Sequence, residues 1–400
     1  MRLRTFESFW LLKNGLLYTY PSLNKNIDCE VAVIGGGITG ALTSHALVEA
    51  GYNVALLDKG DIGQGSSAAT TSMLQYEIDV PMYKLTNLIG EEGASICNKA
   101  GIDAIKKIKS LIEKNKIDCG FGEKHSLYIA HNRKAGKELY VEFEMRNKHH
   151  LGVRWLNAAD VMKQYKIKCY GAILSNTAAS VDAYKLTHEL IKMNKERGMQ
   201  VFDQTELEKF ELDKPVPTIV TSDGNTITCQ RVIFCSGYEA TTMLKENIAR
   251  LFYTYATVSE QNIAIPQKLN DTLIWDTNDP YLYMRTTDDG RLLIGGEDSS
   301  NNISLFKQKI KERKASRLVK NLRKILPEVN FIQDFNWGGT FGSTKDGLPY
   351  IGESPEFKNA LFVLGFGGNG ITFSIQAMDI VVDLMKGREN QLAYYYRFGR

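Results

Sequence analysis

The sequence lacks the cysteine and histidine patterns that hold metals or build disulfide frameworks. Its six cysteines form no CxxC pair, and none of its six histidines lies at metal-ligand spacing from a cysteine. No Ser-His-Asp arrangement or paired carboxylate motif is evident either. We therefore expect reduced thiols in a cytoplasmic protein, no bound metal, and a chemistry carried by something other than these groups.

Long apolar runs and strong net charge are also missing. No stretch approaches the roughly 18 apolar residues of a membrane span, and Glu7 and Lys13 interrupt the segment behind the basic start. A net charge of +3 argues against nucleic-acid binding. With 400 residues, 43% of them hydrophobic, the chain is expected to form two domains. Residues 9–20 are aromatic enough to be a lid or a packing arm, and the sequence leaves both open.

The first positive signal is a strand–turn–helix–strand pattern near the start. Residues 30–34 (EVAVI) predict a buried strand, 35–40 (GGGITG) fit GxGxxG, and 38–50 predict a helix. A second strand over 53–57 ends in Asp58, 23 positions after the first glycine. Strand, glycines, helix, strand and acid in this order are typical of a dinucleotide-binding unit.

Each part of that unit has a physical role. Gly35 permits the tight turn, Gly37 lets a pyrophosphate approach the backbone, and Gly40 lets helix and strand pack closely. The helix N-terminus presents N–H groups to the phosphate. Asp58 is expected to accept hydrogen bonds from the adenosine ribose.

The unit alone does not separate NAD from FAD, but the stretch from Lys59 to Leu74 favours FAD. It combines glycines with small hydroxyl residues, which can press closely against a cofactor. A flexible linker is the alternative, although a linker would not usually run into the apolar pair Met73-Leu74.

In this loop the chain resembles the D-amino-acid oxidase, glycine oxidase and sarcosine oxidase family of flavoenzymes. The resemblance spans residues 28–387 and includes four later segments: 176–186 (NTAASVDAYKL), 231–237 (RVIFCSG), 337–352 (WGGTFGSTKDGLPYIG) and 361–372 (LFVLGFGGNGIT). It implies FAD and an α/β fold, in which a Rossmann-like FAD-binding domain interleaves with a mainly antiparallel-sheet substrate domain. No family cysteine motif for covalent flavin attachment is evident, so FAD is expected to be non-covalent. The predicted FAD-binding ranges are 1–117, 181–240 and 331–400, and the predicted substrate-domain ranges are 118–180 and 241–330.

A second GxGxxG, residues 365–370, follows an apolar strand over 360–364 and opens a helix over 371–385. A second nucleotide site would require another strand ending in an acid, and none follows. We therefore expect this helix N-terminus to face the pyrimidine side of the flavin, as the family places it. Together the motifs and the resemblance predict these cofactor contacts: Gly35, Gly37, Ile38, Thr39, Gly40, Asp58, Lys59, Gly65, Ser66, Ser67, Thr70, Thr71, Met73, Leu207, Ser236, Gly237, Gly367, Gly368, Asn369, Gly370, Ile371 and Thr372.

Between these motifs, helices are expected over 81–117 and 181–197, a strand over 200–202, and strands over 118–180. Two hairpins are expected as well: one joins 218–221 to 226–229, and the other spans 280–296.

The second hairpin supplies the substrate candidates. Alternation puts Tyr281, Tyr283 and Arg285 on one face, where the arginine either binds a substrate carboxylate or sits at a sheet edge beside packing tyrosines. Tyr255, with Tyr253 and Thr257, either lines the cavity or packs in the core. The candidate catalytic residues are Arg285, Tyr283, Tyr255 and Phe341.

The family's charged clamps are absent. Phe341 stands where amino-acid-oxidising members carry an arginine, and Thr372 stands where sarcosine oxidases carry a lysine. A substrate carboxylate buried there would be unpaired, which favours an amine or N-alkyl amino acid. The expected reaction is hydride transfer from the carbon beside nitrogen to flavin N5, hydrolysis of the imine, and reoxidation by O2 or another acceptor. A dehydrogenase that passes electrons to a quinone or protein, and a non-catalytic flavin-binding regulator, stay open as alternatives.

Overall fold

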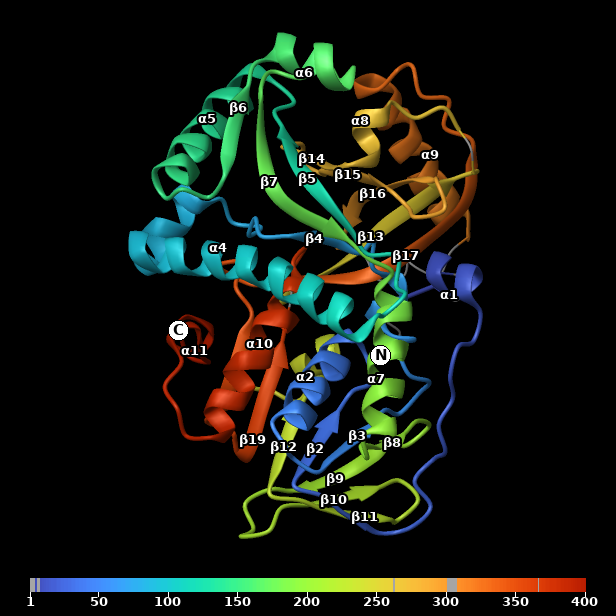
Figure 1. Ribbon diagram of the computed structural model, residues 1–400, viewed down its shortest axis with the longest axis vertical. Coiled ribbons are helices and arrows are strands. Elements are labelled where there is room, and N and C mark those ends of the chain that lie inside the picture. Colours follow the sequence, from blue (N-terminus) through green and yellow to red (C-terminus); the bar gives the residue numbers. More distant parts are fainter. Residues whose placement is uncertain (1–3, 6–7, 262, 301–307, 366) are drawn as a thin grey trace.

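The computed structural model describes residues 4–5, 8–261, 263–300, 308–365 and 367–400. Two lobes follow one another along the long axis of the molecule, each built around its own sheet (Figure 1). The long helix α4 (Met82–Asn115) and the short helix α1 (Phe9–Asn14) lie at the level where the lobes meet (Figure 1).

The lower lobe in Figure 1 is organised by a six-stranded sheet. β2 (Val31–Ile34) and β3 (Val54–Leu57) are strands of four apolar residues each that pair in parallel, as expected for strands covered on both faces. The helices α2 (Ile38–Glu49), α7 (Ala183–Glu196) and α10 (Gly370–Met385) pack side by side in front of it (Figure 1). In order across the sheet the strands are β18 (Tyr350–Ser354), β19 (Phe357–Leu364), β12 (Arg231–Phe234), β2 (Val31–Ile34), β3 (Val54–Leu57) and β8 (Gln200–Phe202).

A four-stranded sheet closes the far end of this lobe. Its outer hairpin is antiparallel, with Thr218 opposite Thr228, and turns at the predicted place. The strands are, in order, β1 (Ile27–Asp28), β11 (Thr226–Thr228), β10 (Thr218–Thr221) and β9 (Leu207–Glu211).

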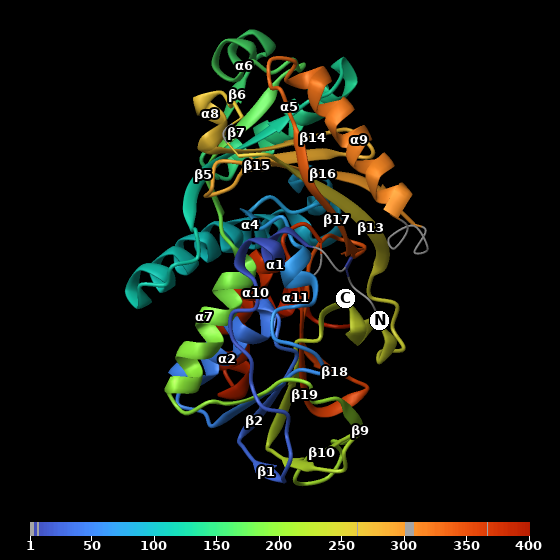
Figure 2. The same cartoon turned by 90° about the vertical axis from the view of Figure 1, so that its right-hand side faces the viewer.

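The upper lobe contains a nine-stranded, mostly antiparallel sheet, and α9 lies against one side of it (Figure 2). Its strands are, in order, β17 (Gln333–Ser343), β13 (Arg250–Ser259), β16 (Leu292–Ser299), β15 (Leu282–Thr286), β14 (Thr272–Asp276), β5 (Gly122–Ile129), β7 (Ala172–Ser180) and β4 (Met73–Gln75), with β6 (Val153–Leu156) beside β7. The remaining helices are α3 (Ser66–Ala69), α5 (Arg133–Lys148), α6 (Ala158–Tyr165), η1 (Gly237–Thr242), α8 (Gln267–Asn270), α9 (Gln308–Ile325) and α11 (Gln391–Tyr396).

The α/β fold class is confirmed, and two details of the predicted organisation are wrong. The expected FAD-binding ranges include residues 73–75 and 333–343, yet β4 and β17 pair into the sheet of the other lobe. β17 runs antiparallel along the full length of β13, and a one-dimensional pattern does not reveal that partner. Residues 118–180 also form the helices α5 and α6 in addition to strands. Within the described ranges, no helix has both the length and the apolar character that a bilayer crossing needs.

Candidate active site

A cavity of about 1180 Å³ connects the two lobes. Its walls come from the turn after β2, the loop that follows β3, the start of α10, and strands β13, β14, β15 and β17 of the large sheet. One continuous space therefore joins the dinucleotide motif to the sheet that was expected to hold the substrate.

The glycine turn after β2 has the close contacts that its sequence predicts. Gly35 has a φ of 112°, and a methyl group there would lie 2.6 Å from the carbonyl oxygen of Cys235. A methyl group at Gly40 would overlap the carbonyl oxygen of Gly35, so α2 touches the turn. At Gly37, the N-cap of α2, only the Ser67 hydroxyl lies close to where a methyl group would be. The turn therefore leaves backbone open to the cavity, as phosphate binding requires.

Asp58 lies at the end of β3 and lines the same cavity. Its Oδ2 accepts a hydrogen bond from the Gly36 N–H at 2.6 Å, and its Oδ1 accepts one from the Gly60 N–H at 2.8 Å. Burial raises the pKa of this carboxyl to about 6, although the two N–H donors act in the opposite direction. The carboxylate is thus held in place beside the turn, and its contact with a ribose stays a prediction.

Two serine hydroxyls at the cavity wall fit a cofactor. The Oγ atoms of Ser66 and Ser236 are buried and have no hydrogen-bond partner within the described part of the chain. Buried hydroxyls are normally paired, and the phosphates and hydroxyls of a dinucleotide are suitable partners. Both residues belong to the predicted cofactor contacts. Ser67 differs, since its hydroxyl accepts the Ile38 N–H at 2.8 Å.

Two indoles, which the sequence did not single out, hold the loop that carries Ser66. Trp10 Nε1 donates to the carbonyl of Thr70 at 2.6 Å, and Trp337 Nε1 donates to the carbonyl of Ala69 at 2.8 Å. Trp10 is fully buried, which makes α1 a packing arm rather than a lid. The available signals were the aromatic residues before the first strand and the tryptophan that opens the segment 337–352.

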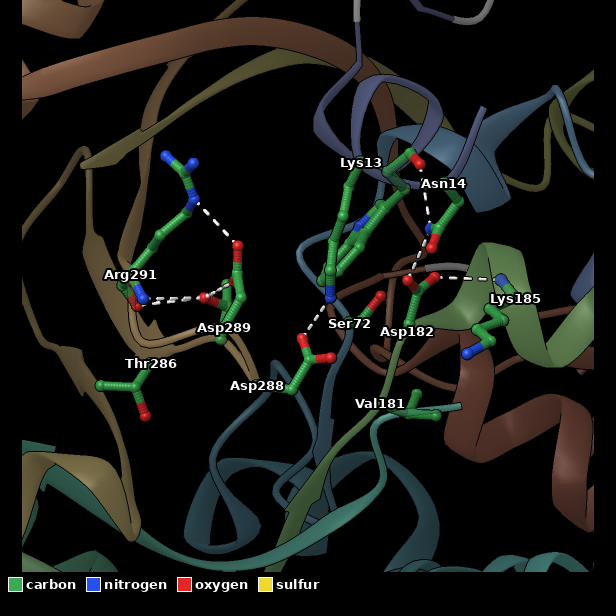
Figure 3. Close-up of polar contacts among 12 residues, drawn as sticks. Lys13, Asn14, Ser72, Val181, Asp182, Lys185, Thr286, Asp288, Asp289 and Arg291 are labelled. Atoms are coloured by element: carbon green, nitrogen blue, oxygen red, sulfur yellow. Dashed lines mark hydrogen bonds and ion pairs between the residues drawn. The ribbon is translucent and has the colours of Figure 1, made fainter. Parts of the chain in front are cut away.

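Further contacts anchor this arm to its surroundings (Figure 3). Lys13 pairs with Asp288 in the turn between β15 and β16, and the Asn14 amide donates to Asp182, the N-cap of α7, at 2.7 Å. The segment before β1 thus supports the loop that carries Ser66.

The second glycine turn also lines the cavity, but protein atoms use part of its hydrogen-bonding capacity. The Gly368 N–H donates to Asp79 Oδ2 at 2.9 Å, and the Asn369 amide donates to the carbonyl of Glu77. Thr372 is buried, is absent from the cavity wall, and donates its hydroxyl to the carbonyl of Gln75 at 3.0 Å. Thr372 thus lies behind the cavity wall with its hydroxyl already engaged, and its contact with the cofactor stays a prediction.

Apart from Gly40 and Thr372, every predicted cofactor residue lines the cavity. Gly40 acts through packing, as described above. The lining residues among the predictions are Gly35, Gly37, Ile38, Thr39, Asp58, Lys59, Gly65, Ser66, Ser67, Thr70, Thr71, Met73, Leu207, Ser236, Gly237, Gly367, Gly368, Asn369, Gly370 and Ile371.

Of the substrate candidates, Tyr255, Tyr283 and Phe341 line the cavity and Arg285 does not. Arg285 is 2% exposed and donates to three backbone carbonyls: Nε to Thr71 at 2.7 Å, Nη1 to Thr286 at 3.2 Å and Nη2 to Val181 at 3.2 Å. Its guanidinium also lies over the Trp10 ring. The hypothesis that Arg285 is a relocated carboxylate clamp is thus wrong. Strand alternation placed Arg285 on the same face of β15 as Tyr283, but it does not show how far along β15 the cavity extends.

The comparisons with known proteins agree with this geometry. Residues 30–384 match the family described as DAO, FAD dependent oxidoreductase. The chain belongs to this family of FAD-dependent oxidoreductases, and FAD is its cofactor.

Two relatives illustrate the family. The chain is 24% identical to the glycine oxidase of Geobacillus kaustophilus (strain HTA426), covering 90% of this chain and 93% of that enzyme. It is 23% identical to the gamma-glutamylputrescine oxidoreductase of Escherichia coli (strain K12), covering 95% and 89% respectively. The crystal structure of the Geobacillus kaustophilus glycine oxidase superimposes with a TM-score of 0.77, covering 93% of this chain and 99% of that one at 21% identity, which shows the shared fold.

Proposed function

We propose that this enzyme oxidises a C–N bond of an amine or amino-acid-like substrate in the part of the cavity walled by the large sheet. The observation that carries the proposal is the continuity of the cavity, which brings Tyr255, Tyr283 and Phe341 into the space that the glycine turn and Asp58 also line. Glycine oxidase and gamma-glutamylputrescine oxidoreductase, two relatives of the chain, are named for substrates that contain nitrogen.

FAD, when bound, would supply the two-electron oxidant as a hydride acceptor at N5, which O2 or another acceptor would reoxidise. The oxidised substrate, an iminium ion after loss of the hydride beside its nitrogen, would hydrolyse in water. The protein's own part is to orient the neutral amine and to exclude water, which requires no protein base. Phe341 and the other aromatic side chains of the wall suit that role, because their rings shape the space and do not take a proton from the substrate amine.

The direct test is anaerobic mixing of the FAD-loaded enzyme with amines, N-methyl amino acids and D-amino acids. Bleaching of the flavin absorbance by at least one amine supports the proposal, and bleaching by none of them refutes it in favour of a regulatory flavoprotein. Stopped-flow reoxidation with O2 and with a quinone then decides between an oxidase and a dehydrogenase.

Two further expectations stay predictions. FAD should be held non-covalently, so acid precipitation should leave the yellow chromophore in the supernatant; a yellow pellet would contradict this. A cytoplasmic location was expected from the sequence, and cell fractionation would test it.

A further inference from the structure

The charged side chains that the large sheet contributes to the cavity all have the same sign. Among the described residues, β4, β5, β13–β17 and the chain segments next to them supply only carboxylates to the lining, namely Glu77, Asp79, Asp276, Asp279 and Asp298. The cationic lining residues, Arg4 and Lys59, are engaged elsewhere: Arg4 contacts Gln64, and Lys59 pairs with Glu239. An anionic substrate group would therefore meet like charge at this wall, whereas a cationic group would meet opposite charge.

Two of these carboxylates have an oxygen that the protein leaves unpaired. Asp298 Oδ1, on β16, and Glu77 Oε2, which follows β4, are buried and have no hydrogen-bond partner within the described ranges. Glu77 is 3% exposed as a whole, and its other oxygen accepts the Ser175 hydroxyl at 2.9 Å and lies near Arg146. Burying a carboxylate oxygen without a hydrogen-bond donor costs free energy. A ligand with an N–H group can supply the donor that each of these two carboxylates lacks.

Burial raises the pKa of Asp298, and three neighbours act in the opposite direction: Thr254 and Tyr281 hydrogen-bond to its carboxyl, and Lys314 attracts it from a distance without a direct ion pair. Lys314 lies on α9 and donates to the Glu297 carbonyl at 2.7 Å, and its Nζ is 3.4 Å from the Glu297 carboxylate. Asp276 is also occupied, because its oxygens accept the N–H groups of Leu282 and Asn278 and the Asn278 amide. Asp79 keeps one oxygen on the Gly368 N–H and has much of its surface in the cavity.

Two tyrosine rings lie near Asp298. Tyr281 and Tyr283 line the cavity with ring centroids 5.7 Å apart. Burial raises the pKa of both phenols, and the negative charge of Asp298 raises it further. The phenols therefore stay neutral, and their oxygens can accept hydrogen bonds. Tyr128 and Trp275 stack at 3.6 Å beside them in the lining. Ring faces and carboxylates together form an environment that favours ammonium groups.

We infer that the enzyme selects a substrate with a second ammonium group, an α,ω-diamine or its N-alkyl derivative, whose distal cation binds Asp298 among Tyr281 and Tyr283. This inference rests on the proposed function, since the other nitrogen of the same molecule is the one oxidised at the flavin. It goes beyond that function by assigning the charge of the substrate's far end. Phe341, in place of a carboxylate-binding arginine, agrees with this, because the site then has no partner for an α-carboxylate.

The test compares three ligand types on the FAD-loaded enzyme under anaerobic conditions. α,ω-Diamines of three to six carbons carry the distal cation, n-alkylamines of equal length lack it, and ω-amino acids replace it with a carboxylate. Affinity is read from the perturbation of the flavin spectrum, and oxidation is read separately from bleaching. We expect at least one diamine to bind about tenfold or more tightly than its n-alkylamine partner, and ω-amino acids to bind worst.

The key variant is Asp298→Asn, which keeps the shape and removes the charge. It should weaken diamine binding about tenfold and n-alkylamine binding less than about twofold, while the unfolding temperature and FAD content stay near wild type. Asp223→Asn, an exposed carboxylate in the turn between β10 and β11, is the matched control and should change none of these.

Equal affinity for diamines and n-alkylamines, or preference for ω-amino acids, would overturn the inference. If Asp298→Asn fails to fold, the ligand comparison on the wild-type enzyme still decides. If diamines bind with the expected preference but no amine bleaches the flavin, the assignment of the cation site stands and the proposed oxidation falls.

Discussion

Replacing Gly35 by alanine should unfold the dinucleotide turn, whereas the same change at Gly37 should remove only the cofactor. At Gly35 the φ of 112° is unfavourable for alanine and costs about 1–3 kcal/mol. The new methyl group would lie 2.6 Å from the carbonyl oxygen and 2.8 Å from the carbonyl carbon of Cys235, so the turn or β12 must move. Such overpacking costs about 1–3 kcal/mol more. The expected loss, about 2–6 kcal/mol, is a large share of a typical folding free energy.

Gly37 differs because its backbone suits alanine and its nearest neighbour, the Ser67 hydroxyl, is 3.1 Å from the added carbon. Stability should therefore change by less than about 1 kcal/mol. The methyl group, however, would project where a pyrophosphate must approach the backbone, so FAD affinity should fall at least about tenfold. Gly122→Ala on β5 is the control, since its added carbon would lie 3.7 Å from the nearest atom.

The assay uses thermal unfolding of the FAD-free proteins, so that cofactor binding does not add to stability, followed by titration with FAD. Wild-type stability in Gly35→Ala would refute the strain argument. Wild-type FAD affinity in Gly37→Ala would refute the phosphate path.

Three further predictions follow from the same contacts. Arg285→Met removes hydrogen bonds to three backbone carbonyls but also removes a guanidinium whose pKa burial lowers to about 10, so we expect a net loss of about 2–4 kcal/mol in stability with an unchanged substrate KM. Arg313→Met, on the exposed side of α9, is the control, and a raised KM at wild-type stability would restore Arg285 to the site. Trp10→Phe removes one hydrogen bond to the cavity loop. It should lower stability by about 1–3 kcal/mol and speed FAD dissociation. An unchanged rate of FAD dissociation in a destabilised variant would show that α1 does not support cofactor binding. Burial raises the pKa of Asp79 to about 6 and also raises the pKa of Asp298. Both carboxyls therefore ionise as the pH rises, and the Kd for diamines should fall about tenfold from pH 5 to pH 7. A Kd that does not change with pH would contradict this.

The local motifs were readable in the sequence because they depend on neighbours along the chain. Gly35, Gly37 and Gly40 are spaced by the geometry of one turn and one helix, and Asp58 ends the strand that pairs next to it. The dinucleotide-binding unit followed from these features, whereas the fold class and FAD followed from the family resemblance over residues 28–387. The second glycine turn was likewise recognised as a helix start, and α10 begins at Gly370.

Contacts between distant segments were decided only by the tertiary structure. Alternation along β15 placed Arg285 beside Tyr283 on one face. In the structure Arg285 lies outside the cavity wall, over the ring of Trp10 from some 275 residues earlier and hydrogen-bonded to backbone carbonyls. Likewise, the edge position of β17 depends on its pairing with β13.

The sequence by itself thus determined the glycine turn, because the turn rests on short-range backbone geometry, and it pointed to the family and the cofactor through the resemblance over residues 28–387. Which side chains surround the substrate was decided by the packing of the large sheet against the FAD-binding lobe. That packing brings Glu77, Asp79 and Asp298 to one wall. The spacing of these three residues along the chain does not predict that they lie close together. The charge of the site depends on all of them, and only folding brings them together.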